Sequence, residues 1–296
     1  MSESSETLRR QITSASDLES VVRTMKALAA SSISQYERAV QSLDDYYRTV
    51  ELGLVAWHHQ GGPDRSPRRT GRMNAEGIGA VVFGSDQGLV GQFNEEVADF
   101  AVARLRDMPG SKHIHAVGER VQGYLNDAGL PVNARFPVPN SITAITPLVG
   151  SILMEIETQR ERGQLDQVYL FHNCPRSAAQ CEPVMQRLLP LDDAWKKGLT
   201  TIPWPTHKLP EVFGDVSRTR RTLISEYLFI SLFRACAESL ASEHTSRLVA
   251  MRRAEKNIEG LLEELNRSFN RQRQNAIDEE LFDVISGFEA LNADGR

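Results

Sequence analysis

The chain has 296 residues, of which 34 are basic and 39 acidic, so its formal net charge is −5. This balance disfavours a general nucleic-acid-binding protein, because such proteins are usually basic. No apolar stretch approaches the roughly 18 residues of a membrane-spanning helix, and the polar, acidic N-terminus resembles neither a secretory signal nor an Arg-rich transit peptide. Three cysteines in a chain of this length do not make a disulfide scaffold, so we expect a protein of a reducing compartment.

An apolar stripe with a mean spacing of about 3.5 residues runs from Leu8 through Leu18 to Trp57. This is the period of a coiled coil, and no proline occurs before Pro63. The pattern predicts a coiled-coil helix over residues 1–60.

A second stripe runs from Leu223 to Phe269, and no proline follows Pro210. It predicts a coiled-coil helix over residues 214–296, with Glu255 as a charged exception in the stripe. A compact chain of this mass would be only about 50 Å across, too small for either helix, so we expect an elongated molecule. If both helices meet one globular body at the same end, they run antiparallel and bury their stripes on each other.

The C-terminal helix is expected to be the longer of the two, so its last turns would lack a partner within the chain. An apolar helix end of this kind needs a covering surface from another molecule. The alternative is that this end folds back or frays. The apolar residues concerned are Leu281, Phe282, Val284, Ile285, Phe288 and Leu291.

Between the two helices the sequence period changes. Residues 61–76 are rich in Gly, Pro and Arg and predict a linker. Short apolar runs then alternate with helical segments, which predicts a small three-layer, Rossmann-like α/β domain over residues 77–213. The predicted strands are 77–84, 113–117 and 167–171, and the predicted helices are 94–106 and 147–162.

A glycine-rich turn follows the first predicted strand, at the position where open α/β sheets bind ligands. Its backbone N–H groups could hold a phosphate. However, the spacing is not G-x-G-x-x-G, the turn lacks G-K-[ST], and Asp86 would repel an anion. We therefore expect a structural turn, with a small-molecule site as the alternative. The residues of this turn are Gly84, Asp86, Gly88 and Gly91.

The sequence contains only weak indications of a metal site, a disulfide or a catalytic site. No histidine lies at zinc-ligand spacing, although His113 and His115 share one face of a predicted strand. Cys174 and Cys181 could form a regulatory disulfide, but free thiols are expected in a reducing compartment. No nucleophile–base arrangement can be assembled, so we expect no catalytic residues, no cofactor and no metal.

One polar stretch of the C-terminal helix stands out. Arg267 and Asn270–Ala276 form what we call the basic collar, and Asp278–Glu280 with Asp283 follow it. Charged loops of a surrounding partner could grip this collar through planar Arg side chains. The alternative is an ordinary solvated helix with i, i+4 charge pairs.

Four segments, in order along the chain, together resemble the gamma subunit family of F-type ATP synthases over essentially the whole length. The third reads E-S-L-A-S-E-H-T-S-R-L-V-A-M, against E-S-x-A-S-E-x-x-x-R-x-x-A-M in the family. The segments are Arg10–Ile12 with Val22–Ala30, Ser85–Asn94, Glu238–Met251, and Leu265–Ile277 with Ile285–Leu291.

The resemblance implies a central rotor shaft inside a ring of alternating alpha and beta subunits. It implies that the apolar C-terminal tip sits in a sleeve of that ring. The α/β body would lie against the epsilon subunit and the ring of membrane c subunits, at the cytoplasmic face of the bacterial plasma membrane. ATP chemistry would occur in the ring. The residues that the resemblance and the apolar tip assign to ring contacts are Met25, Lys26, Arg273, Gln274, Asp278, Leu281, Phe282, Ile285 and Phe288.

The chain departs from the family pattern at several positions. Gln87 replaces an Arg of the turn, Asp278 stands where Thr is common, and Arg253–Lys256 replaces an A-A-T-D run. These departures suggest a divergent branch, such as the alternate, sodium-coupled bacterial form. Two other hypotheses stay open: a coiled-coil scaffold with an α/β head, and a small-molecule enzyme that uses the Gly84–Gly91 turn.

Overall fold

The computed structural model describes residues 2–59, 77–177, 180–191, 193–208, 211 and 214–293. The predicted linker at residues 61–76 lies outside these ranges. The chain forms two compact units, one of residues 1–28 with 250–296 and the other of residues 29–249. Each of the two long helices contributes one segment to each unit.

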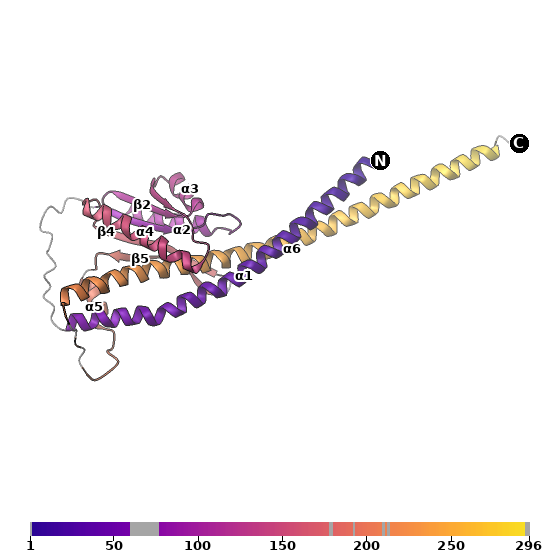
Figure 1. Cartoon of the computed structure of the whole chain (residues 1–296). Helices are drawn as coiled ribbons and strands as arrows, with labels where there is room; N and C mark the ends of the chain where they lie inside the picture. Colours follow the sequence, from indigo (N-terminus) through magenta and orange to yellow (C-terminus); the bar gives the residue numbers. More distant parts are fainter. Residues whose placement is uncertain are drawn as a thin grey trace. The chain divides into compact units, whose positions relative to one another are not determined.

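The predicted long helices are confirmed as α1 (Ser2–His59) and α6 (Val216–Ala293), which begin and end the ribbon in Figure 1. In the 29–249 unit they run antiparallel, because Tyr36 contacts His244 whereas Tyr46, further along α1, contacts Glu226, earlier on α6. Side chains on α1 are buried at an interval of seven residues, the coiled-coil repeat. These residues are Ala15, Val22, Ala29 and Tyr36.

Leu18 was predicted to lie in the buried stripe, and this is wrong because its side chain is 55% exposed. Three residues turn a helix by about 300°, so Leu18 lies about 60° away from the buried position of Ala15. Val21 and Leu28 are likewise exposed. The buried seam of α1 is therefore narrower than the apolar stripe in the sequence.

The 29–249 unit contains a five-stranded sheet in the order β3-β2-β1-β4-β5. The first four strands in this order are parallel, and β5 pairs antiparallel to β4. The structure confirms the three predicted strands and adds β3 and β5. The strands are β1 (Ile78–Phe83), β2 (Lys112–Val117), β3 (Val132–Phe136), β4 (Gln167–Ser177) and β5 (Gln180–Leu189).

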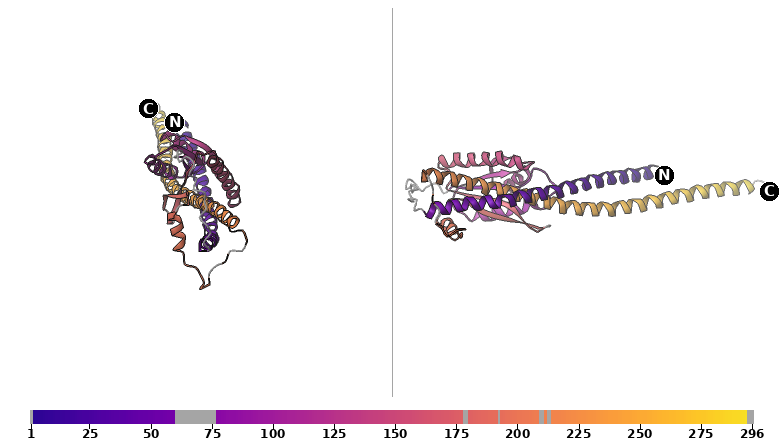
Figure 2. Two further views of the ribbon diagram at one scale, coloured as in Figure 1. Left: turned by 90° about the vertical axis from the view of Figure 1, so that its left-hand side faces the viewer. Right: turned by 60° about the horizontal axis from the view of Figure 1, so that its bottom comes forward.

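Helices cover both faces of this sheet, which gives the predicted three layers. On one face, α2 (Phe93–Arg106) and α3 (Glu119–Asp127) bury apolar side chains against β1, β2 and β4. On the other face, α4 (Ile142–Glu161) and the adjoining part of α6 share a larger core with the sheet, to which Tyr36 of α1 also belongs. Figures 1 and 2 show α4 running along the sheet. The sheet is therefore anchored directly on the long helices of this unit.

Three helices differ from the sequence prediction, and one of them, α3, was not predicted. The helix expected at residue 147 begins five residues earlier, with Pro147 inside it. Pro147 is the sixth residue of this helix, so its missing N–H removes the one backbone hydrogen bond that would reach Thr143. A short helix, α5 (Asp193–Thr200), was not predicted, and its Leu199 packs against Leu54 and Tyr227 of the two long helices.

Candidate functional site

The glycine-rich turn after β1 is held by its own side chains. Asp86 accepts hydrogen bonds from the backbone N–H groups of Glu119, at the start of α3, and Val138, both at 2.9 Å. Asn94 Oδ1 accepts from the Ser85 N–H at 2.9 Å, and Asn94 Nδ2 donates to Ser85 Oγ at 2.8 Å. These contacts connect the turn to α2, to α3 and to the segment that follows β3.

The glycines of the turn have steric roles. A Cβ atom on Gly84 would lie 2.3 Å from Val121 Cβ, so α3 packs directly on the backbone there. Gly91 has φ +61°, in the left-handed region that glycine adopts at little cost. Leu89 shares this conformation and is 62% exposed. Gly88 and Gly91 border an open hollow of about 1100 Å³, which Arg120 and Asp127 of α3 also line. Arg120 Nη2 would lie 3.8 Å from a Cβ atom on Gly88.

Buried charged groups fasten the sheet to α6. Glu238 Oε2 accepts from His172 Nε2 of β4 at 2.9 Å, and Glu238 Oε1 accepts from Arg234 Nε at 2.7 Å. Burial alone would raise the pKa of Glu238, but the hydrogen bonds from His172 and Arg234 outweigh burial and lower it. Arg234 also reaches Asp44 of α1 at 3.2 Å. One ionised carboxylate thus ties β4 to α6, and its arginine extends the link to α1.

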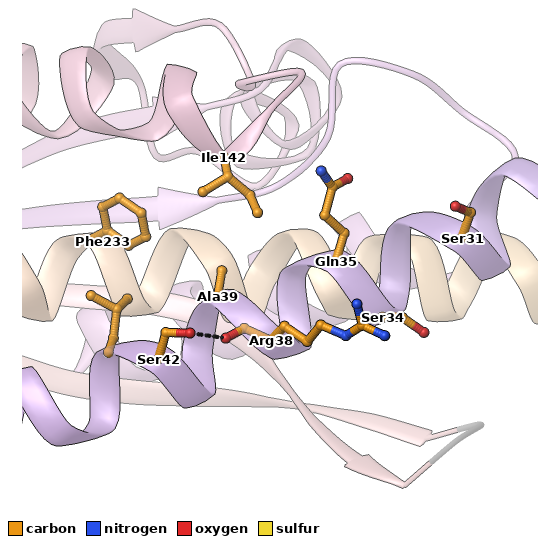
Figure 3. Close-up of a pocket in the computed structure, with 9 residues that line it drawn as sticks. Ser31, Ser34, Gln35, Arg38, Ala39, Ser42, Ile142 and Phe233 are labelled. Carbon is orange, nitrogen blue, oxygen red and sulfur yellow. Dashed lines mark hydrogen bonds between the residues drawn. The ribbon is translucent and has the colours of Figure 1, made fainter.

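A groove of about 900 Å³ lies between α1, α4 and α6 in the same unit. Figure 3 shows Ile142 and Phe233 on one side of it and Gln35, Arg38 and Ser42 of α1 on the other. None of the residues that line it is a histidine, a cysteine or a carboxylate, so the groove contains no nucleophile–base pair. The lining residues are Ser31, Ser34, Gln35, Arg38, Ala39, Ser42, Leu43, Ile142 and Phe233.

The C-terminal part of α6 presents the predicted contact residues to solvent. Arg273, Gln274 and Asp278 are exposed. The apolar residues beyond them are exposed too, with Phe282 at 67% and Val284 at 70%. The side chain of Phe288 lies outside the described residues. The exposed apolar residues are Ile277, Leu281, Phe282, Val284 and Ile285.

On α1, the structure separates the two predicted contact residues. Met25 packs beside the small core that Val22 of α1 makes with Met251 and Ile258 of α6. Lys26 points instead to α6 of the same unit, where its Nζ lies 2.7 Å from Glu255 Oε1 and 2.5 Å from Oε2. Lys26 is therefore one partner of an ion pair within the chain, and Met25 lies next to it in the sequence.

Within the described ranges, no helix is long and apolar enough to span a membrane, and no three His, Cys, Asp or Glu side chains are grouped to hold a metal ion. His115, predicted to share a face with His113, is buried and lies 3.0 Å from the amide of Gln159. Burial lowers the pKa of His115. His115 is therefore a core residue on the face of the sheet that α4 covers.

Comparison with known proteins decides between the hypotheses left open by the sequence. A family model described as ATP synthase matches residues 4–291. The ATP synthase gamma chain of Nitrosomonas europaea is 27% identical over 297 residues, covering 97% of this chain and 99% of the relative. That of Polynucleobacter asymbioticus is 26% identical, with the same coverage. The chain belongs to the ATP synthase gamma-chain family.

Solved structures share the fold of this gamma chain. A chain of the Euglena gracilis mitochondrial ATP synthase rotor, in rotational state 1, aligns with a TM-score of 0.61 and 16% identity, covering 94% of this chain and 100% of that one. A chain of the Tetrahymena thermophila mitochondrial ATP synthase central stalk and c-ring aligns with a TM-score of 0.57 and 19% identity. The alignment covers 79% of this chain and 99% of that one. Gamma chains are non-catalytic stalk subunits, so this chain carries no ATP-hydrolysing site of its own.

The cysteines of this gamma chain are free thiols. Cys174 stands opposite Glu182 in the β4–β5 ladder, and Cys181 stands opposite Pro175. Because successive side chains of a strand point to opposite faces, the two thiols leave the ladder on different faces. Burial raises the pKa of Cys174 to about 11 and also raises the pKa of Cys181. Both groups are therefore protonated and poorly nucleophilic at neutral pH.

Proposed function

We propose that this gamma chain is the central-stalk rotor that couples transmembrane ion flow to ATP synthesis or hydrolysis in a ring of alpha and beta subunits. The observation that carries the proposal is the apolar end of α6. Leu281, Phe282, Val284 and Ile285 are 46–70% exposed on a helix that continues to Ala293. An exposed apolar surface next to charged residues is typical of a protein–protein contact site.

The charged residues before this end support the same proposal. Arg273 and Gln274 project from α6 with their donor groups exposed, and Asp278 follows them. A planar guanidinium beside an amide can bind carboxylates and backbone carbonyls of an encircling loop, which would set the rotational position of the helix. We assign these residues, with Met25 and the apolar tip, to contacts with the alpha/beta ring.

The remaining assignments rest on family membership. We propose that the epsilon subunit and the c-subunit ring bind the α/β body, and that the chain is peripheral to the cytoplasmic face of a bacterial plasma membrane. The boundaries 1–60, 77–213 and 214–296 are proposed as the functional division into coiled-coil helix, body and coiled-coil helix. These partners do not require a cofactor on this chain.

Reconstitution tests the proposal. The chain is expressed with the alpha and beta subunits of the same organism, the complex is isolated by size, and ATP hydrolysis is measured with and without the chain. We expect one copy per alpha/beta hexamer and turnover that depends on it. A chain that stays alone, or that pairs with itself, would instead favour a coiled-coil scaffold that takes no part in ATP turnover.

The small-molecule hypothesis has its own test. Both Asp86 oxygens accept backbone hydrogen bonds, so this carboxylate is held at the turn, where it would repel an anionic ligand. We expect no thermal shift of the chain on addition of ATP or inorganic phosphate. A shift that Gly88→Ala abolishes would support a ligand site at the turn.

A further inference from the structure

Glu255 makes the ion pairs that join the two helices of the unit formed by residues 1–28 and 250–296. Its carboxylate holds Lys26 Nζ at 2.5 and 2.7 Å, and Arg23 Nε lies 3.9 Å from its Oε1. Within the described residues of this unit, the other ion pairs lie inside one helix, such as Arg23 with Glu19 and Arg267 with Glu263. We call the contact of Glu255 with Lys26 and Arg23 the Glu255 clamp.

The clamp differs from an ordinary surface ion pair in its burial. The Glu255 side chain is only 16% exposed and that of Lys26 32%, whereas Arg267 and Glu263 are 78% and 70% exposed. Exposed pairs contribute little because water and salt screen them. A largely buried carboxylate that loses its partner keeps its desolvation cost, so removal of either partner is more damaging than removal of an exposed one.

The hydrogen bonds of the clamp depend on direction, whereas the apolar contacts beside it do not. Val22, Met251 and Ile258 form a small core at the same level, and apolar contacts of this kind resist separation of the helices. They resist sliding and rotation poorly, because the hydrophobic effect is non-directional. Two short hydrogen bonds from one ammonium to one carboxylate fix the register of α1 against α6.

We infer that Glu255 is a positioning residue of the rotor: through Lys26 it locks α1 to α6, so that torque on one helix is carried by both. This inference rests on the proposed rotor function. Arg273 lies on α6 about five turns beyond Glu255. Torque applied there would reach α1 only through contacts between the helices. Among the described residues of this unit the clamp is the ionic contact between α1 and α6, and Arg234 with Asp44 is a second one in the 29–249 unit. Glu255 also occupies a segment, Arg253–Lys256, that departs from the family's usual residues.

Charge exchange tests the clamp. The full complex is reconstituted into sealed vesicles with wild-type chain, Lys26→Glu, Glu255→Lys, or both substitutions together. The ratio of ATP synthesis to ATP hydrolysis is measured at equal assembly. We expect each single substitution to lower the ratio by about two-fold or more, and the double substitution to restore it, because the pair re-forms with reversed polarity.

Two further variants keep the test decisive. Glu255→Gln preserves the shape of the side chain and is expected to fold while lowering the ratio. Glu263→Gln, which breaks an exposed pair within α6, is the matched control and should leave the ratio unchanged. Normal coupling in Glu255→Gln, or a double variant worse than both single ones, would overturn the inference. If the wild-type chain itself fails to support turnover, the proposed rotor function fails instead.

Discussion

Tyr36 of α1 stacks on His244 of α6, with ring centroids 5.6 Å apart and planes inclined by 12°. Tyr36 belongs to the core that α4 and α6 share with the sheet, and beside His244 the buried Glu243 accepts a 2.6 Å hydrogen bond from Arg247. Burial, and to a smaller extent Arg247, lowers the pKa of His244 from 6.5 to about 4. His244 is therefore neutral at pH 7 and packs as an aromatic ring.

This geometry predicts a pH dependence of stability. Between pH 6.5 and about 4 the unfolded chain binds a proton at His244 that the folded chain does not, so the free energy of unfolding falls as the pH falls. The slope from this group is at most about 1.4 kcal/mol per pH unit. His244→Phe keeps a ring on Tyr36 and removes the proton. Urea unfolding at pH 7, 6 and 5 should give a shallower decline for this variant than for the wild type.

His207→Phe is the matched control, because His207 is exposed. As the pH falls, the unfolding free energy of His207→Phe should decline as steeply as that of the wild type. Equal slopes for the wild type and His244→Phe would show that folding does not shift the pKa of His244.

The basic collar should matter for coupling more than for assembly. Arg273→Ala with Gln274→Ala removes side chains that are exposed in this chain, so the fold should be unaffected. If the pair acts through the ring, ATP synthesis should fall by about ten-fold, the loss expected for one charge-assisted contact of about 1.4 kcal/mol. ATP synthesis by vesicles, normalised to assembled complex, measures this. Arg252→Ala, which removes an exposed arginine of α6 outside the basic collar, should have little effect.

The apolar tip should contribute to assembly rather than to the stability of the chain. Phe282 is 67% exposed in the chain alone, so Phe282→Ser should leave the thermal unfolding temperature unchanged. If the ring covers this side chain, binding to the alpha/beta hexamer should weaken by about 1.5–3 kcal/mol. Met154→Ser is the matched control, because Met154 is 71% exposed on α4 of the other unit. Equal affinities for the wild type and Phe282→Ser would remove the tip from the interface.

The parts of the fold that could be predicted from sequence are those with one uninterrupted local pattern. The long helices have a coiled-coil stripe without proline, β1 and β4 each contain a continuous apolar run, and β2 is rich in apolar residues. β3 was missed because it is an edge strand, in which Asn133 and Arg135 face solvent. β5 contains Pro183, and α3 buries only Val121 and Leu125, so neither shows a clear period.

The residues of the candidate site also fall into those that the sequence could predict and those that it could not. Exposed residues on α6, such as Arg273 and Phe282, could be proposed from the pattern of one helix and from family resemblance. The pairing of Lys26 with Glu255 could not, because the two residues are 229 positions apart and each pattern is local. Glu255 is visible in the sequence only as a charge within an apolar stripe. Its partner is decided by how two distant helices align.

The turn after β1 gives a prediction about folding stability. A Cβ atom on Gly84 would lie 2.3 Å from Val121 Cβ and 2.7 Å from Asn94 Oδ1, so Gly84→Ala must displace α3 or break the Ser85–Asn94 hydrogen bonds. Overpacking of this kind costs about 1–3 kcal/mol, which urea unfolding would detect as a lower midpoint. Gly150→Ala is the control, because nothing lies within 4 Å of its added Cβ. In a helix interior this change should stabilise the chain by up to about 1 kcal/mol. A normal midpoint for Gly84→Ala would mean that α3 does not pack on the turn in solution.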